Sequence, residues 1–267
     1  MKSMTCNFRN PIISRARGLS TWRIAIAILV LPIAIASTAN AANELDAGEV
    51  VQKADRVRFP GEAFEAGVTI ETTGDGTSAE TRKYRILSKG NDNTIVMVTE
   101  PSSERGQIML MKGHDLWIFL PNVSQPVRLS LSQRLTGQVA NGDLARVNFS
   151  GDYDASLLRS EVIDGNDMYV LELSARERNV TYHKVLYWVR KSNFWPYKAE
   201  FYSLSDRLLK TAQYDDFRKV AGSVRPMRMV MQDALRKDEV STLTYTEIRP
   251  RDLPDRMFTK DYLKRLE

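Results

Sequence analysis

The sequence predicts a mainly β (α+β) fold. We expect a single curved antiparallel sheet of about eleven strands that forms a half-closed barrel, covered by an N-terminal helix and a short helical lid. Apolar and polar residues alternate with a period of two through most of the chain after residue 63, as half-buried strands require. Turn residues separate these segments about every 10 residues, a spacing typical of an antiparallel meander. One helical segment precedes the strands, and one glycine-rich segment interrupts them.

The first 41 residues have the pattern of a secretory signal peptide. Five basic residues and no acidic residue accompany an apolar run at 24–36, and Ala39-Asn40-Ala41 offers a small-x-small cleavage site. The run is too short for a bilayer core, which needs about 20 residues. An uncleaved membrane anchor is the alternative. We expect a cleaved leader at 1–41 and one domain at 42–267, exported to the periplasm of a Gram-negative bacterium.

The charge and cysteine content of the mature chain exclude several classes of function. The full chain has 38 Lys and Arg residues against 33 Asp and Glu residues. The leader holds five of these cations, so the mature chain carries 33 charges of each sign. Such a chain has no field that would attract nucleic acid. The single cysteine, Cys6, lies in the leader, so we expect no disulfide and no cysteine-ligated metal.

The helical segment begins at Asp46, which can cap free N–H groups, with Glu49 at the capping-box position. Apolar residues then recur at helical spacing: Val50, Val51, Ala54 and Val57. Phe59-Pro60-Gly61 ends the helix. The predicted strands that follow occupy 64–71, 78–90, 94–101, 107–112, 115–120, 124–130, 168–175, 181–190, 197–204, 208–215, 224–233 and 239–248.

The glycine-rich segment at 131–159 has no clean period of two. Gly137, Gly142 and Gly151 break it into short pieces, so we expect a loop with short helical turns. Loops of this length inside a domain are usually functional or mobile. The chain is predicted to end in a short helix from Thr259, anchored by Phe258.

Motifs for catalysis are missing from the sequence. It has no Gly-x-Ser-x-Gly elbow, no phosphate-binding glycine loop and no His-Glu-x-x-His motif. Its two histidines, His114 and His183, are expected at a surface turn and on a strand surface rather than in a metal site. The sequence therefore predicts a protein that is not an enzyme and needs no cofactor.

Methionine and aromatic residues gather on several strand faces. Methionine is unbranched and polarizable, so a methionine-lined surface can repack around varied apolar ligands. An ordinary core, in which methionine fills gaps, is the alternative for each residue alone. Together they predict a hydrophobic ligand cavity lined by Met109, Met111, Trp117, Phe119, Leu186, Trp188, Met227, Met229 and Met231.

The strand at 115–120 is apolar on both faces. Trp117 and Phe119 point one way, while Leu116, Ile118 and Leu120 point the other. We expect Trp117 and Phe119, with the methionines of the preceding strand close by, to form the cavity wall. The pattern does not decide which of the two faces lines the cavity.

The concave side of such a sheet is too wide for side chains alone to fill. We expect helices to cover it and the remaining space to hold acyl chains, because each buried methylene contributes about 0.8 kcal/mol. The 131–159 segment would form the lid, with Leu135, Val139 and Leu144 as its apolar residues.

Three stretches resemble the LolA-like outer-membrane lipoprotein-sorting proteins: GHDLWIFLPNVSQPVRLS, QRLTGQVANGDLARVNFSGDY and YHKVLYWVRKSNFWPYKAEFYSLSDRLLKTAQYDDF. The family pattern has a Gly-x-Asp-x-Trp strand that ends in Leu-Pro, a basic residue before a Ser-rich bend, and a later Trp-Val-x-Lys strand. The matching positions are Gly113, Asp115, Trp117, Leu120, Pro121, Arg128, Trp188, Val189, Lys191, Lys198, Glu200, Phe201 and Tyr202.

The resemblance implies a half-closed antiparallel barrel with a helical lid, spanning residues from about 45 to 266. It implies that acyl chains of lipoproteins or other lipids are the ligands, and that an inner-membrane transporter of the RND or MMPL type is a partner. A lipid-responsive sensor or adaptor that binds such a transporter is the alternative to a carrier. Three arginines, Arg105, Arg128 and Arg134, compete for the place of the classical carrier's functional arginine.

Overall fold

The computed structural model describes residues 46–74, 77–90, 92–146 and 148–263. The predicted leader and Cys6 lie outside these residues. Within the described part of the chain, the helices are all too short or too polar to cross a membrane.

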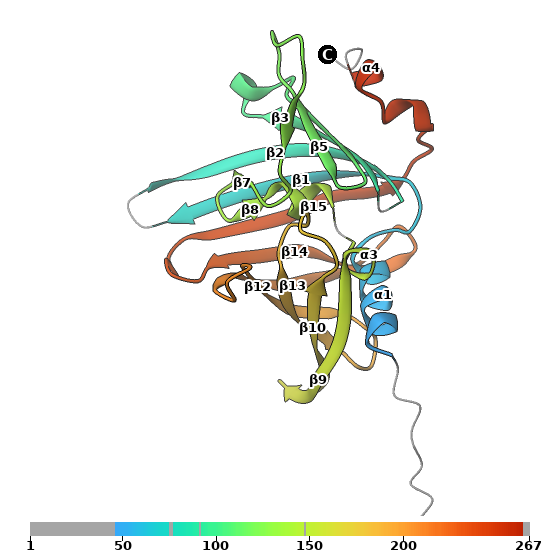
Figure 1. Cartoon of the computed structure of the whole chain (residues 1–267), viewed down its shortest axis with the longest axis vertical. Coiled ribbons are helices and arrows are strands. Elements are labelled where there is room, and N and C mark those ends of the chain that lie inside the picture. The colour runs from blue at the N-terminus through green and yellow to red at the C-terminus, as the bar shows by residue number, and fades with distance from the viewer. Residues whose placement is uncertain (1–45, 75–76, 91, 147, 264–267) are drawn as a thin grey trace, which may run out of the picture. The chain divides into compact units, whose positions relative to one another are not determined.

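Thirteen antiparallel strands form one open sheet, in the order β6-β5-β4-β3-β2-β1-β15-β14-β13-β12-β11-β10-β9. Figure 1 shows that the sheet curves strongly, so that strands near its two edges run in different directions from β1 and β15 at its centre. The predicted fold class is confirmed. The strands are β1 Phe64–Gly74, β2 Thr77–Lys89, β3 Asn93–Glu100, β4 Ile108–Lys112, β5 Asp115–Phe119, β6 Val127–Leu129, β9 Tyr153–Ile163, β10 Asn166–Ala175, β11 Lys184–Arg190, β12 Pro196–Tyr202, β13 Leu208–Val220, β14 Ser223–Asp233 and β15 Val240–Pro250.

The N-terminal helix α1 spans Ala47–Arg58, as the capping residue predicted. The side chain of Asp46 accepts a hydrogen bond from the N–H of Gly48 at 3.1 Å, and Phe59 leaves the helix in an extended conformation. The described residues end in the helix α4, Lys260–Leu263, which follows the buried Phe258. The predicted C-terminal helix and its anchor are therefore confirmed. Two 3-10 turns are η1, Ser102–Glu104, and η2, Asp255–Met257.

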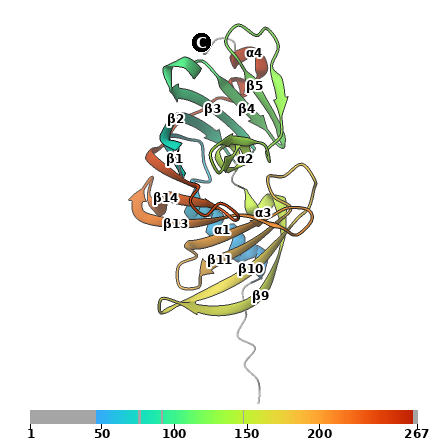
Figure 2. The ribbon, with the colours of Figure 1, turned by 90° about the vertical axis from the view of Figure 1, so that its left-hand side faces the viewer.

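Residues 131–152 connect the two halves of the sheet, and we call them the covering segment. They form a small hairpin, β7 (Arg134–Thr136) with β8 (Val139–Ala140), followed by the short helices α2 (Asn141–Ala145) and α3 (Phe149–Asp152). Figure 2 shows α1, α2 and α3 against one face of the sheet. We call this the inner face and the opposite one the outer face.

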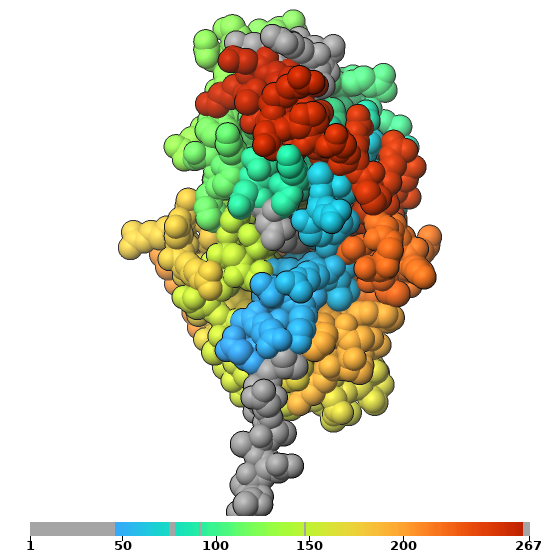
Figure 3. Space-filling model, turned by 90° about the vertical axis from the view of Figure 1, so that its right-hand side faces the viewer, coloured from blue at the N-terminus to red at the C-terminus, as the bar shows by residue number. Residues whose placement is uncertain are grey.

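The main core lies on the inner face, where α1 and the covering segment pack against almost every strand. Val50, Val51 and Ala54 of α1 are all buried there. A second core lies on the outer face of β2 to β5, where the C-terminal segment contributes Leu253, Met257, Phe258 and Leu263. In Figure 3 this C-terminal segment, in red, lies over the green strands, and one side of α1 reaches the surface.

The strand β9 corrects the expectation of a loop up to residue 159. It begins at Tyr153 and pairs with β10 along its whole length. The period-two signal is weak here because β9 is an edge strand with few buried residues. A register shift between Leu157 and Arg159, opposite Val170 and Leu171, interrupts the alternation further.

Candidate functional site

The five predicted cavity methionines lie together on the inner face. Met109 and Met111 belong to β4, and Met227, Met229 and Met231 belong to β14. All five are buried in the main core. The alternation of β14 directs all three of its methionines to this face, while Arg228 between them reaches solvent and pairs with Asp215 at 2.6 Å.

Trp117 and Phe119 are on the outer face, so their grouping with Met109 and Met111 was wrong. Residues directly opposite in an antiparallel pair share a face. The two-residue turn after Lys112 places Met111 opposite Leu116, and Leu110 opposite Trp117. Trp117 and Phe119 therefore pack under the C-terminal segment, where Lys260 lies 4.1 Å from the centre of the Trp117 ring.

Leu186 and Trp188 also lie away from the methionines. They pack with Met168 and Val170 in a third cluster on the outer face of β10 and β11. The inner face of β11 carries Val185, Tyr187 and Val189 instead. Both sets of side chains in this strand are apolar, so its pattern did not distinguish the two faces.

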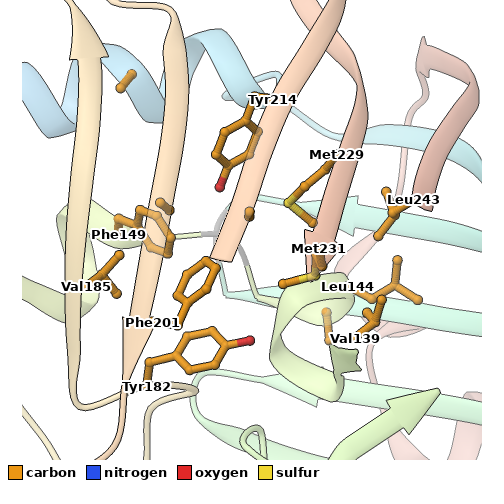
Figure 4. Packing of buried hydrophobic residues seen from close by; sticks show 14 of the residues in the cluster. Val139, Leu144, Phe149, Tyr182, Val185, Phe201, Tyr214, Met229, Met231 and Leu243 are labelled. Atoms are coloured by element: carbon orange, nitrogen blue, oxygen red, sulfur yellow. The ribbon is translucent and has the colours of Figure 1, made fainter. Parts of the chain in front are cut away.

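The predicted lid residues belong to the covering segment. Val139 and Leu144 are fully buried in the main core, and Leu135 is half-buried against it. Figure 4 shows Val139 and Leu144 beside Met231 and Leu243 of the sheet. The short helix α2 and the two-stranded hairpin of β7 and β8 thus close the methionine-lined face.

Polar contacts from β13 and from the segment just before β11 hold the first part of the covering segment in place. The buried Lys210 of β13 donates a hydrogen bond from Nζ to the backbone oxygen of Gln138. The same Nζ lies 3.5 Å from a carboxylate oxygen of Asp143. The hydroxyl of Tyr182 donates to that carboxylate at 2.7 Å.

The second part of the covering segment is held by a buried arginine. Arg146 donates to both carboxylate oxygens of Asp152, at 2.7 Å and 2.5 Å. It also donates to Asp92 at 2.9 Å and to the backbone oxygen of Gly113 at 3.1 Å. His114 contacts Asp152 at 3.0 Å through Nε2. His114 was expected at a surface turn, but it is half-buried and joins this turn to α3.

Arg58, at the end of α1, is a charged residue inside the main core. Its guanidinium donates to Asp55 at 3.2 Å and lies 4.2 Å from the centre of the Phe149 ring. The second oxygen of Asp55 accepts from the N–H of Ser150 at 2.7 Å, which joins α1 to α3. Burial raises the pKa of the Asp55 carboxyl, although the neighbouring Arg58 opposes this shift.

Two small spaces lie beside α1. A cavity of about 30 Å³ lies between Phe59, Phe64 and Leu144, and another of about 20 Å³ lies between Arg58, Tyr214 and Met229. Each has room for little more than one water molecule. A space of about 230 Å³ lies farther away, between Leu135 of β7 and strands β2 to β6.

A family model described only as an uncharacterized protein matches residues 90–265. No curated protein matches the chain. Among solved structures, a LolA superfamily protein from Nitrosomonas europaea is 59% identical and superposes with a TM-score of 0.79. That alignment covers 82% of this chain and 99% of the other.

The chain belongs to the LolA superfamily.

Two more distant structures share its fold. A putative outer membrane lipoprotein-sorting protein domain from Vibrio parahaemolyticus is 23% identical, with a TM-score of 0.71, covering 82% of this chain and 98% of that domain. A DUF1329 family protein from Desulfovibrio piger is 22% identical, with a TM-score of 0.71, covering 81% and 97%. The family resemblance identified from the strand motifs is thereby confirmed.

The buried charges of this LolA superfamily member were missed in the sequence. Charged residues are rarely buried unless they are paired, and no pattern in the sequence singled out Lys210, Arg146 and Arg58, which are all buried. Two partners are close in sequence, Asp55 three residues before Arg58 and Asp152 six residues after Arg146. The partners of Lys210 and the second carboxylate partner of Arg146, Asp92, are more than 50 residues away. By contrast, the arginines considered from the motifs, Arg105, Arg128 and Arg134, all lie at the surface.

Proposed function

We propose that this protein is a non-enzymatic periplasmic carrier that binds acyl chains of lipoproteins or other lipids and moves them between membranes. One observation carries the proposal. The apolar inner face, with its five methionines, is closed by the covering segment, which packs Val139 and Leu144 against it and is held by polar contacts that include those of Lys210 and Arg146.

Movement of the covering segment would create the chamber. Val139 and Leu144 would leave the inner face, and acyl chains would take their place against Met109, Met229 and Met231. Such an exchange changes the free energy little, because the acyl chains cover the apolar inner face that Val139 and Leu144 leave exposed when they move away. Methionine suits this role because its flexible side chain packs against chains of different shape.

Family membership supports the same function. The name of the Vibrio parahaemolyticus domain assigns outer membrane lipoprotein sorting to that domain. At 23% identity, the likeness between that domain and this chain is one of fold. The cargo proposed here is therefore inferred from the apolar inner face of this chain. In this proposal Leu135, Val139 and Leu144 form the moving cover, while Trp117, Phe119, Leu186 and Trp188 make no contact with the cargo.

The proposal is tested by lipid transfer between two populations of vesicles. Donor vesicles carry a fluorescent phospholipid or a fluorescent triacylated lipopeptide, and the protein is added with unlabelled acceptor vesicles. We expect transfer to rise with protein concentration. Native mass spectrometry of protein exported to a bacterial periplasm should also show bound lipid.

A pair of leucine substitutions on opposite faces makes the test specific. Leu144→Ala removes a side chain of the cover from the inner face, and Leu110→Ala removes a buried side chain from the outer face. Each costs about 2–5 kcal/mol of folding free energy. Leu144→Ala should speed lipid uptake, whereas Leu110→Ala should leave the rate unchanged.

Two results would contradict the carrier function. Protein that is always isolated empty and that binds neither labelled lipid would exclude it. Lipid that is bound but never passed to acceptor vesicles would instead favour a lipid-responsive sensor.

A further inference from the structure

The space beneath β7 differs from the two small cavities beside α1. It has a volume of about 230 Å³ and lies between the covering segment and the inner face of β2 to β6. Its apolar wall includes Val98, Met109, Ile118 and Leu135. An apolar cavity of about 150 Å³ in another protein holds a benzene molecule, so this pocket has room for part of an alkyl chain while the cover stays closed.

One buried hydroxyl in this pocket has no acceptor for its proton among the described residues. The side chain of Tyr84 lines the pocket and is 2% exposed. Its hydroxyl has no acceptor among the described residues, while the neighbouring Arg82, which can only donate, opposes the effect of burial on its pKa. Burial raises the pKa of Tyr84 to about 12, so the hydroxyl keeps its proton and can donate. Leaving a buried hydroxyl without a partner costs free energy, which a ligand with an acceptor oxygen would recover.

The rim of the pocket carries an arginine, Arg134, that forms no hydrogen bond or salt bridge with a described residue. Arg82 and Glu104 lie on the rim and pair with each other. Arg134, on the opposite side of the rim, is exposed. The charge of Arg134 acts on Asp233, whose carboxylate already accepts from backbone N–H groups of Leu235 and Arg236. Arg82 is neutralised by Glu80 and Glu104, so Arg134 is the cation on the rim that is left to bind an anionic head.

We infer that this pocket binds a single alkyl chain with an anionic head, such as a fatty acid carboxylate or a phosphate monoester. The chain lies against Met109 and Ile118, and the head accepts hydrogen bonds from Tyr84 and Arg134. This inference rests on the proposed carrier function and narrows its ligand class. A single-chain anion enters the pocket that already exists, whereas a triacylated lipoprotein requires the cover to move.

Affinity measurements with matched probes test recognition of the head. Dodecanoate, dodecyl phosphate and dodecanol share one chain length and differ in the head group. We expect both anions to bind the full-length mature protein about tenfold more tightly than dodecanol, as charge-assisted hydrogen bonds are stronger than neutral ones. Equal affinities of the two anions would show recognition of negative charge, and a preference for one would identify the carboxylate or the phosphate as the natural head.

Two substitutions separate the head contacts from folding. Arg134→Gln alters an exposed side chain, and Tyr84→Phe removes a hydroxyl that lacks an acceptor among the described residues, so neither should lower the melting temperature. Arg134→Gln should abolish the preference for anions, and Tyr84→Phe should weaken anion binding several-fold. Arg134→Gln should not change the affinity for dodecanol, whereas Tyr84→Phe should weaken dodecanol binding less than it weakens anion binding, because a neutral acceptor forms the weaker hydrogen bond. Arg207→Gln, at an exposed turn, is the matched control.

Methionine methyl NMR locates the chain without a substitution in the wall. On addition of dodecanoate, the methyl signal of Met109 should shift, while that of Met168 in the outer-face cluster should not. A shift at Met229 with none at Met109 would place the chain elsewhere and overturn the inference.

The remaining outcomes distinguish the inference from the carrier function. Equal binding of dodecanoate and dodecanol by the unmodified protein would overturn head recognition. Binding of a triacylated lipopeptide without binding of any single-chain probe would overturn the inference and leave the carrier function standing. Failure of all four ligands would overturn both.

Discussion

Lys210 of β13 donates a hydrogen bond to the backbone oxygen of Gln138, a residue 72 positions earlier in the chain. This contact joins the sheet to the turn between β7 and β8. Because Lys210 is buried, water competes poorly for its ammonium group, and the contact is stronger than an exposed one. The covering segment is thus attached to the sheet at a point that a single substitution can remove.

Lys210→Met should loosen the covering segment. Gln138 loses its donor and Asp143 loses a nearby cation, at a cost of about 1–3 kcal/mol. Asp143 keeps its hydrogen bonds from Tyr182 and from the N–H of Ala140, so the protein should remain folded. Hydrogen exchange should accelerate at residues 138–142, and uptake of a fluorescent fatty acid should become faster.

Lys219→Met is the control for this substitution, since Lys219 is exposed on the same strand. It should change neither exchange nor uptake. Unchanged exchange at 138–142 in Lys210→Met would show that the contact does not hold the cover.

Arg146→Ala should destabilise the fold strongly. The substitution leaves the buried Asp152 without the two hydrogen bonds from the guanidinium, at a cost of about 3–5 kcal/mol. Arg146→Lys keeps the positive charge but lacks the planar guanidinium that binds both carboxylate oxygens. Its loss of folding free energy should therefore be intermediate. Urea denaturation measures both. Arg176→Ala breaks an exposed pair with Asp154 and should cost less than about 1 kcal/mol; a similar loss in all three variants would contradict the assigned role.

Phe258→Ala tests the separation between the outer-face and inner-face cores. The Phe258 side chain is 2% exposed and anchors the C-terminal segment over β2 to β5. Its removal should cost about 3–5 kcal/mol and change the fluorescence of Trp117, which this segment covers. Lipid binding at low denaturant concentration should not change. Loss of lipid binding in the still-folded variant would show that the two cores are coupled.

Glu65 predicts a specific loss of stability in acid. Burial raises the pKa of its carboxyl, but hydrogen bonds from Arg85, Arg251 and Arg249 outweigh burial and lower the pKa to about 2. In the unfolded chain the Glu65 carboxyl has the ordinary pKa of a glutamate, about 4.3. The folded state therefore binds the proton more weakly, and the stabilisation is complete above about pH 5 and declines as the pH falls toward 2.

Glu65→Gln should make the free energy of unfolding less dependent on pH over this range. Urea denaturation at several pH values between about 5 and 3 gives the slope. Glu71→Gln, at an exposed position of the same strand, should keep the slope of the unmodified protein. Parallel slopes for all three proteins would exclude Glu65 as the source.

Local patterns in the sequence predicted the elements well where one face of each element is buried. The cap at Asp46 and the apolar spacing that follows it predicted α1, and alternation predicted most strands. The edge strand β9 was missed because an edge strand buries few residues and carries a register shift. The position of Trp117 was misassigned although a signal existed: the two-residue turn at Gly113 and His114 fixes which residues lie opposite each other.

The sequence by itself determined that this chain forms a curved antiparallel sheet with one covering helix, since the alternation of apolar residues is a local property of each strand. It also determined that strand 115–120 is apolar on both faces. Only the tertiary structure decided what covers each face. The covering segment lies against Leu116 and Ile118, and the C-terminal segment lies against Trp117 and Phe119. These partners are distant in sequence, and an apolar face is equally satisfied by any apolar cover, so no local pattern specifies which segment provides it.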